Sequence, residues 1–294
     1  MARTARLGAV GLAMIVAGLA VAPARALELP PHKDAVFAYP GILETRDGGA
    51  FRVVDYREQR DINGRDEVPE LRAAARYLKL SVRKKQSDAV AGTGAGPVAH
   101  FAVGAPERAT VIVIYVHGKG GNRKQGVNDL TFGGNFNRLK NLVVSGGGLY
   151  LSPDFADFAE RGASQIAGLA AYYAARSPGA PIYIACGSMG GAICYGLAAG
   201  EADRNVSGYL WLGSFADERL LASAAAKARK PFFFAQGSAD KVFPVEAQER
   251  LYAALRAKAR TYPVRFVRFE TGSHGTPIRM VDWRETLNWM LSLR

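Results

Sequence analysis

The sequence has few of the residue types that build disulfide frameworks and zinc sites. Its 294 residues include only 2 cysteines and 4 histidines. Two cysteines are too few for a disulfide framework, and no histidines have the spacing of zinc ligands, so we expect no metal site. Cys186 and Cys194 both lie in apolar sequence. We therefore favour two buried thiols, with a bridge between them as the alternative that an oxidising compartment would permit.

Long low-complexity tracts and internal repeats are also missing. Apolar residues make up 49% and charged residues 22% of the chain. These values are close to the globular average, which excludes wholesale disorder and fibrous repeats. A chain of this size buries roughly three quarters of its unfolded surface without any disulfide scaffold. We therefore expect one folded domain.

The only long apolar run lies at the start of the chain. Arg3 and Arg6 precede an uncharged stretch over 7–21, and Ala24-Arg25-Ala26 follows it. This pattern predicts a secretory signal over 1–26, cleaved after its last residue, and a periplasmic or secreted domain over 27–294. The alternative is an uncleaved anchor, but the run is shorter than the ~20 residues that span a bilayer. We expect no stable membrane span once the signal is removed.

Basic residues exceed acidic ones. The net charge is +12, from 38 Lys and Arg against 26 Asp and Glu. Removing the three arginines of the signal leaves 35 against 26, a net charge of +9. No segment combines dense Lys and Arg with interleaved aromatics, and none has zinc-finger spacing, so we expect no nucleic-acid partner. A solvated basic surface is the interpretation we favour.

The chain after residue 110 alternates short apolar runs with helix-length segments. Apolar runs that continue without alternation predict parallel strands that are buried on both faces. We therefore predict an α/β fold: a single domain with a mostly parallel central sheet and helices on both faces. The strands are expected at 111–116, 149–151, 182–185, 209–212, 232–235 and 264–269, and the helices at 135–145, 159–176, 189–200, 217–229, 244–259 and 277–293. Arginines interrupt the last strand, which favours an edge position.

The region before residue 110 is less regular. Residues 27–50 contain Pro and Gly pairs and look irregular, and 51–56 is a plausible strand. Apolar and polar residues alternate over 77–83, which predicts a strand with one wet face. Residues 89–97 are rich in Gly and Ala, and we expect a flexible loop there. Short antiparallel strands from this region would complete the sheet.

A serine lies between a predicted strand and a predicted helix. The segment Cys186-Gly187-Ser188-Met189-Gly190 differs from the nucleophile-elbow pattern G-x-S-x-G only in its first residue, where Cys is still small. Such a turn needs small residues two positions before and after the serine, since strand and helix would otherwise collide. It presents the hydroxyl clear of the sheet, with unpaired helix N–H groups aimed at developing negative charge. The alternative is a glycine-rich turn with an incidental serine.

A nucleophilic serine needs a base, and the base needs a carboxylate to orient it. Of the four histidines, His274 follows the last predicted strand in a Gly-flanked loop. Asp240 follows the strand before it, and Asp217 follows the strand before that and is the competing acid. Asp154 is expected to stabilise its own loop. The other three histidines have less suitable positions. His32 lies in the proline-rich segment after the signal, His100 lies before the parallel strands, and His117 begins the glycine-rich segment 117–122.

The order Ser188, Asp240, His274, each after a strand, resembles the α/β-hydrolase family over about residues 110–294. Ser152-Pro153-Asp154-Phe155 also resembles that family's post-strand turn. In the family the acid commonly follows the next-to-last strand, which implies Asp240 rather than Asp217. The segment 117–122 resembles the family's oxyanion loop. By that resemblance, one backbone N–H comes from Lys119 or Gly120 and the other from Met189.

Two features bear on the substrate. Lys119, Arg123 and Lys124 surround the glycine-rich loop. Their charges are either simply solvated, or they favour the binding of an anionic substrate. The glycine-rich loop could also be interpreted as a dinucleotide-binding loop. Arg123 stands where such a loop needs its third glycine, which excludes this interpretation. Only residues 213–216 separate one strand from its helix, which leaves no room for a large cap domain and makes loops 117–134 and 154–163 the expected roof.

These features predict an exported serine hydrolase that cleaves carboxylic esters through an acyl-enzyme on Ser188. Its partner would be a small-molecule acyl substrate, with an anionic group as one option. The chemistry requires no cofactor, either metal or organic. The same three groups could serve a thioesterase, an amidase or an acyltransferase. A catalytically silent envelope binding protein is the alternative outside enzymes.

Overall fold

The computed structural model describes residues 27–63, 66–67 and 72–294, together with Met1. The predicted signal therefore lies outside the described residues apart from its first methionine. Among the described residues, no helix combines the length and apolar character needed to cross a membrane.

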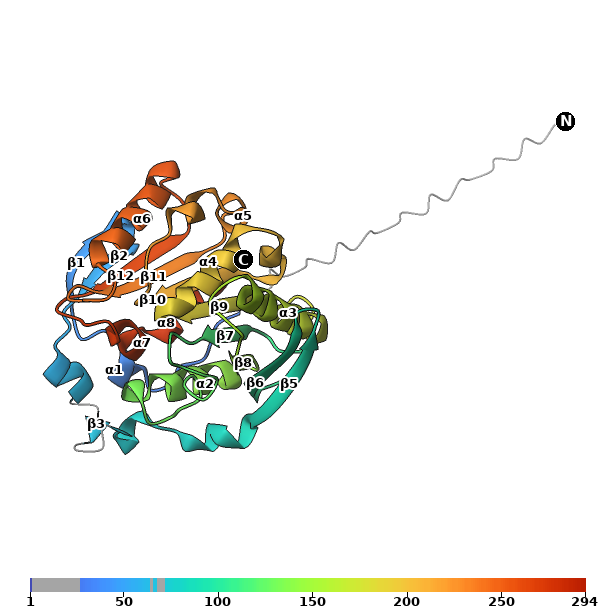
Figure 1. Cartoon of the computed structure of the whole chain (residues 1–294), viewed down its shortest axis with the longest axis horizontal. Helices are drawn as coiled ribbons and strands as arrows, with labels where there is room; N and C mark the ends of the chain where they lie inside the picture. Colours follow the sequence, from blue (N-terminus) through green and yellow to red (C-terminus); the bar gives the residue numbers. More distant parts are fainter. Residues whose placement is uncertain (2–26, 64–65, 68–71) are drawn as a thin grey trace.

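A ten-stranded sheet in the order β1-β2-β12-β11-β10-β9-β7-β8-β6-β5 forms the centre of the domain (Figure 1). The seven strands from β2 to β8 in this order run parallel, and β1, β6 and β5 pair antiparallel at the two ends. The strands are β1 (Ile42–Arg46), β2 (Phe51–Val54), β5 (Gln86–Thr93), β6 (Gly96–Gly104), β7 (Ile112–Val116), β8 (Leu149–Pro153), β9 (Ile182–Gly187), β10 (Gly208–Leu212), β11 (Phe232–Gly237) and β12 (Val264–Phe269). A separate antiparallel pair joins β3 (Asp66–Glu67) to β4 (Arg72–Ala73).

Helices cover both faces of the sheet, as its strand pattern predicts. Successive residues of β7 pack into two different hydrophobic clusters, Ile112 and Ile114 into one, Val113 and Tyr115 into the other. The first cluster includes residues of α3 (Glu160–Arg176), α4 (Gly191–Ala199), α5 (Ala224–Lys227) and α6 (Val245–Lys258), and the second includes residues of α2 (Asn135–Ser145), α7 (Thr276–Met280) and α8 (Trp283–Leu291). A further short helix, α1, spans Asp34–Phe37.

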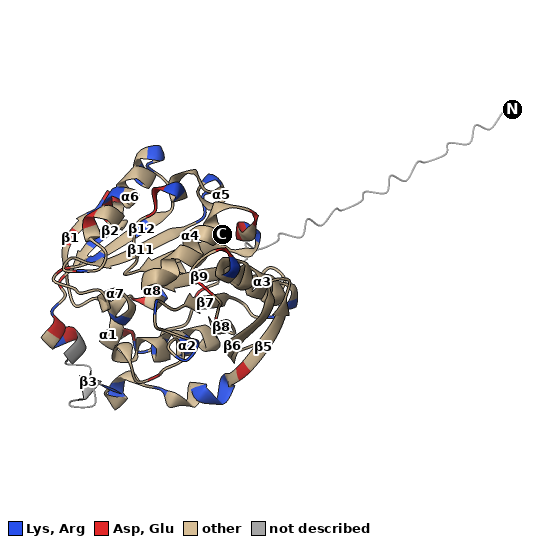
Figure 2. Cartoon of the chain, viewed as in Figure 1, with Lys and Arg blue, Asp and Glu red and all other residues tan. Residues whose placement is uncertain are grey.

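The five central strands β7 to β11 contain no charged residue, whereas helices and loops around them carry charge (Figure 2). A strand buried on both faces has no position at which a charge could reach water. This is why the sequence pattern located these strands to within a few residues.

Three expectations for the front of the chain were wrong. Residues 27–50 are not irregular throughout, because they contain α1 and β1. Residues 77–83 do not form a strand; they run from the end of the 3-10 turn η3 (Ala75–Tyr77) through two extended residues into a second 3-10 turn, η4 (Leu80–Lys85). Residues 89–97 are not a loop but the centre of the β5–β6 hairpin. The small residues there are tolerated because β6 pairs with β5 on one side and with β8 on the other. Long-range pairing thus overrode weak local preference.

The expected edge position of 264–269 was also wrong, because β12 lies between β11 and β2. Its arginines are partly exposed and paired rather than solvated at an edge. Arg268 contacts Glu270 at 2.9 Å and Glu249 at 3.4 Å, and Arg265 lies 3.7 Å from Glu285. The edge is instead formed by β1, which the β1–β2 hairpin adds.

Two predicted helices are each divided. Residues 217–229 split at Ser223, whose hydroxyl caps α5 after the 3-10 segment η8 (Glu218–Ala222). Residues 277–293 split at Asp282, whose carboxylate accepts the N–H groups of Arg284 and Glu285 at the start of α8. Side-chain caps of this kind favour a new helix start over continuation.

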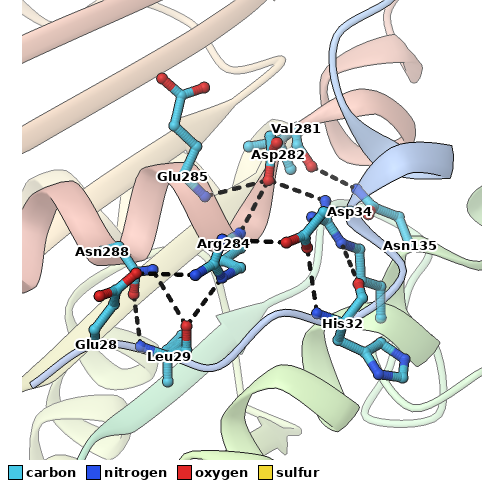
Figure 3. A network of polar contacts seen from close by, with 11 residues as sticks. Glu28, Leu29, His32, Asp34, Asn135, Val281, Asp282, Arg284, Glu285 and Asn288 are labelled. Carbon is cyan, nitrogen blue, oxygen red and sulfur yellow. Dashed lines mark hydrogen bonds and ion pairs between the residues drawn. The ribbon is translucent and has the colours of Figure 1, made fainter.

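A polar network attaches the segment before α1 to helix α8 (Figure 3). The Leu29 N–H donates to Asn288 Oδ1 at 2.8 Å, and Arg284 donates to the Leu29 carbonyl at 3.0 Å. Arg284 also pairs with Glu28 at 2.9 Å and with Asp34 at 3.1 Å. Because Leu29 itself is fully buried, residues 28–34 are part of the packed domain.

Candidate active site

Ser188 lies at the carboxyl end of β9, in a turn that only small residues allow. Its φ is +52°, in the left-handed region that non-glycine residues rarely adopt. A Cβ at Gly190 would lie 2.7 Å from the His117 carbonyl oxygen and 2.8 Å from that of Val116. The helix that begins after Ser188 is therefore packed directly against the end of β7. This close approach is the physical reason for glycine two positions after the serine.

The loops after β9, β11 and β12 bring three predicted site residues together. His274 Nδ1 lies 2.8 Å from Asp240 Oδ2, and His274 Nε2 lies 2.8 Å from Ser188 Oγ. With a carboxylate at Nδ1, that nitrogen carries the proton and donates it to Asp240. Nε2 is then the acceptor for the serine hydroxyl. The hydroxyl, imidazole and carboxylate form one hydrogen-bonded chain.

Both carboxylate oxygens of Asp240 accept hydrogen bonds. Its side chain is fully buried, and its Oδ1 accepts the N–H groups of Val242 at 2.7 Å and Phe243 at 3.1 Å. Its Oδ2 accepts Gln236 Nε2 at 2.7 Å in addition to the imidazole. These bonds satisfy a carboxylate that would be costly to bury alone.

Gln236 was missed by the sequence reasoning. It is fully buried on β11, and its Nε2 also donates to the Phe243 carbonyl at 2.8 Å. The signal was an amide side chain at the end of an otherwise apolar strand, Phe232–Gly237. A buried amide at the functional end of a strand requires partners, and here one partner is the carboxylate that holds the imidazole.

The competing acid, Asp217, does not reach His274. Its carboxylate caps η8 and pairs with Arg219 at 2.6 Å. This hydrogen bond with Arg219 lowers the pKa of Asp217. Asp154 contacts Arg123, accepting its backbone N–H at 2.7 Å and pairing with its guanidinium at 2.5 Å. Its carboxylate therefore stabilises the neighbouring loop 117–124 and not, as expected, its own loop.

The other three histidines have separate environments. His100 is buried on β6, with ring nitrogens 2.7 Å from the Tyr173 hydroxyl and 3.0 Å from the Val98 carbonyl, and burial lowers its pKa. Burial also lowers the pKa of His32 to about 4. The buried His117 ring stacks on Phe155 with 4.4 Å between centroids. His274 is the histidine that contacts Ser188.

The expected oxyanion loop lies beside the nucleophile. A Cβ at Gly118 would lie 2.9 Å from Ser188 Cβ, so only glycine lets this loop approach so closely. Lys119 follows Gly118 and is exposed, and Met189 follows Ser188 at the start of the helical turn. The backbone of both segments thus borders the Ser188 side chain.

The cations of this loop are not equivalent. Arg123 pairs with Asp154 and, at 3.1 Å, with Asp88. Its charge is therefore balanced by two carboxylates, whereas Lys119 and Lys124 are exposed. Arg123 is therefore not free to bind an anionic substrate, and Lys119 and Lys124 remain as the two candidates for that role.

The interpretation of Cys186 and Cys194 as free thiols was wrong, because they form a disulfide. Cys186 belongs to the strand residues that face α4, and Cys194 lies on the inner face of that helix. Both residues are fully buried. The bridge joins the strand before Ser188 to the helix after it, so the nucleophile lies inside the closed loop.

No cluster of three or more His, Cys, Asp or Glu side chains suited to a metal ion occurs in the described part of the chain. Residues 213–216 connect β10 directly to Asp217 and η8. This connection carries no cap domain, as its length predicts.

The fold is shared with solved structures of α/β hydrolases. A putative α/β hydrolase of unknown function from Agrobacterium tumefaciens, ATU1826, is 16% identical with a TM-score of 0.55, covering 70% of this chain and 95% of that one. XC6422 from Xanthomonas campestris, described as an α/β serine hydrolase without lid, is 16% identical with a TM-score of 0.52, covering 71% and 94%. The esterase Pf2001 from Pyrococcus furiosus is 12% identical with a TM-score of 0.51, covering 71% and 92%. No family model and no curated protein sequence matches the chain. The chain has the α/β-hydrolase fold.

Proposed function

We propose that this chain, with its α/β-hydrolase fold, is a serine hydrolase that cleaves carboxylic esters through an acyl-enzyme on Ser188. The observation that carries the proposal is the chain of two 2.8 Å contacts from Ser188 Oγ through His274 to Asp240. A glycine-rich turn with an incidental serine has no reason to align its hydroxyl with an imidazole that a buried carboxylate holds. Solved structures with this fold include proteins described as esterases.

In the first half of the reaction, His274 Nε2 takes the hydroxyl proton as Ser188 Oγ attacks the ester carbonyl carbon. The negative charge that develops on the carbonyl oxygen is stabilised by the backbone N–H groups of Lys119 and Met189. The imidazolium then protonates the departing alcohol, which leaves the acyl group on Ser188. Asp240 keeps its own charge throughout and stabilises the imidazolium.

In the second half, His274 removes a proton from water, which attacks the acyl carbon. The same N–H groups stabilise the second tetrahedral intermediate, and the proton returns to Ser188 as the acid departs. Removing one oxyanion donor costs about a hundredfold to a thousandfold in kcat in comparable enzymes. Thioesters, amides and acyl transfer to an acceptor other than water use the same groups, and the choice of an ester is part of the proposal.

A fluorophosphonate probe tests the nucleophile. We expect the wild-type protein to become covalently labelled, and Ser188→Ala to abolish labelling while keeping the wild-type thermal unfolding midpoint. Ser292→Ala, which changes an exposed serine just after α8, is the matched control and should still label. A wild-type protein that does not label would instead support a silent binding protein.

A panel of p-nitrophenyl esters, thioesters and anilides with one acyl group then tests the bond that is cleaved. Hydrolysis of the ester with the highest kcat/KM supports the esterase assignment. A higher value for the thioester or the anilide would replace it by a thioesterase or an amidase.

Export to the periplasm or medium is also part of the proposal. Two observations support it: the disulfide, which persists in oxidising compartments, and the anchoring of Glu28 and Leu29 immediately after the expected cleavage point. Intact-mass measurement of the protein expressed from its full sequence should give a chain that begins at Leu27. A cytosolic chain that retains residues 1–26, with two free thiols, would contradict export.

A further inference from the structure

A cavity of about 540 Å³ lies between α3, α4 and the segments that follow β10 and α4. Its floor consists of small residues on the two facing helices, including Ala163 on α3 and Ala192 and Gly196 on α4. A Cβ placed at Gly196 would meet Ala163 Cβ at 3.3 Å. The helices are therefore close together here, and larger side chains at these positions would occupy the space.

The cavity lies along α4, the helix that follows the nucleophile. Ala192 lies four residues after Ser188, which is about one helical turn. At one wall, Phe158 packs on Phe155 with 5.2 Å between ring centroids, and Phe155 stacks on His117 of the oxyanion loop. This wall connects the cavity to the loop expected to bind the carbonyl oxygen.

The opposite wall connects the cavity to the base. Phe215 lines the cavity and packs against Phe243 with 5.7 Å between centroids, and Phe243 contacts the His274 ring at 5.5 Å. Phe243 thus links this wall of the cavity to the imidazole of His274.

The interior offers apolar contact rather than polar recognition. Tyr195 lines the cavity, but its hydroxyl already donates to the Phe215 carbonyl at 2.8 Å. Asp217 and Arg219 also line it, and they pair with each other at 2.6 Å. The rest of the lining consists chiefly of aromatic rings and alanines, together with Glu160, Ser164 and Ser223, so an apolar group fits most of this space.

The position of the cavity indicates which part of an ester it would hold. Its lining includes residues of the Ser188 helix and none from the loops that carry Asp240 or His274. A leaving alcohol must stay within reach of His274, which protonates it, whereas the acyl group stays bonded to Ser188. From this placement we propose that the cavity is an acyl-binding site for an apolar acyl group of several carbons. The inference depends on the proposed ester hydrolysis.

The test varies the acyl chain with the leaving group fixed. Each buried methylene increases kcat/KM by about fourfold at most, so p-nitrophenyl hexanoate should exceed the acetate by about tenfold or more. Gly196→Phe, which places a ring in the cavity, should lower kcat/KM for the hexanoate about tenfold and change the acetate value by less than about twofold. Ala199→Phe, at an exposed position of the same lining, repeats the test should Gly196→Phe not fold.

Ala253→Phe is the matched control, because Ala253 lines a different cavity, of about 770 Å³, beside α6. It should leave both esters unchanged. Equal loss on acetate and hexanoate in a folded Gly196→Phe protein, or a wild-type protein without preference for the hexanoate, would overturn the proposal.

A second comparison separates the acyl group from the alcohol. Gly196→Phe should slow ethyl hexanoate and spare hexyl acetate; the reverse result would assign the cavity to the leaving group and overturn the acyl assignment. Failure of this inference is distinguishable from failure of the hydrolase proposal. A wild-type protein that hydrolyses acetate esters without chain preference lacks only the acyl site, whereas one that neither labels with fluorophosphonate nor hydrolyses any ester lacks the activity.

Discussion

The disulfide between Cys186 and Cys194 should stabilise the fold by an amount that its loop length sets. The two cysteines are 8 residues apart in sequence. In the chain-entropy treatment, a loop of this length restricts the unfolded chain by about 2.5 kcal/mol at 25 °C. Since both residues are fully buried, the reduced protein keeps the same atoms in the same core and loses chiefly this constraint.

Urea unfolding of the oxidised and the reduced wild-type protein measures the difference directly. We expect the reduced protein to unfold with a free energy about 2.5 kcal/mol lower, and the slope of the transition to rise because a longer free chain is exposed. The Cys186→Ala, Cys194→Ala double variant should be insensitive to reductant. Coincident transitions for the oxidised and reduced protein, with thiol titration verifying each state, would refute the reasoning.

The same reduction should act on catalysis through geometry. Ser188 has a left-handed backbone conformation inside the closed loop, and such conformations persist only where surrounding structure imposes them. Loss of the bridge should therefore lower kcat and leave KM nearly unchanged, measured below the temperature at which either form unfolds. An unchanged kcat in the folded, reduced protein would show that packing alone holds the turn.

Three further changes have defined outcomes. Ser188→Ala and His274→Ala should each lower kcat by several powers of ten, and the double variant should be little worse, because the two groups act as one unit; additive losses in ester hydrolysis would contradict this. Gln236→Leu removes one donor to Asp240 and one to the Phe243 carbonyl, and it should lower kcat about tenfold with a similar KM; an unchanged kcat at wild-type stability would contradict a positioning role. Asp129→Asn leaves the buried Lys140 without its ion-pair partner at 2.7 Å, so urea unfolding should show a loss of about 3–5 kcal/mol. Although burial alone would raise the pKa of Asp129, hydrogen bonds from Asn137, Lys140 and Arg83 lower it. The stabilisation by ionised Asp129 is therefore fully present above the unfolded pKa of about 4 and is lost as pH falls through the lower folded pKa. The difference in unfolding free energy between wild type and Asp129→Asn should accordingly disappear in acid, and a difference that persists there would contradict this account.

The central strands were predictable because burial on both faces requires a continuous run of uncharged residues, which can be recognised in the sequence alone. Five strands without charge, each followed by a polar or glycine-rich segment, can be found without knowing their neighbours. The position of β12 could not be found in this way. Its arginines are compensated by Glu249 and Glu285, which come from other parts of the chain, and by Glu270, which directly follows the strand. A charge inside a strand excludes a central position only when no partner is available.

The disulfide was missed for a related reason. Pairing depends on the distance between Cys186 and Cys194, and their Cα atoms lie 6.3 Å apart only because α4 folds back along β9 after a tight turn. That turn was itself predicted from Ser188 and its small neighbours. A tight turn after β9 places residues in the first turn of α4 opposite the end of that strand. Cys186 and Cys194 occupy these two positions, so the predicted turn together with the cysteine spacing would have indicated the disulfide, whereas the spacing alone does not.

Strand order explains why Asp240 rather than Asp217 reaches the imidazole. The sheet places β11 directly beside β12, whereas β10 is one strand further away. Neighbouring strands are about 4.8 Å apart, so a carboxylate after β10 would have to cross the loop after β11 to contact His274. Asp217 instead satisfies local donors, capping η8 and pairing with Arg219. In this sheet the acid that orients the base therefore follows β11, the strand adjacent to β12, and an exchange of roles between the two aspartates would require the loop after β11 to be rebuilt.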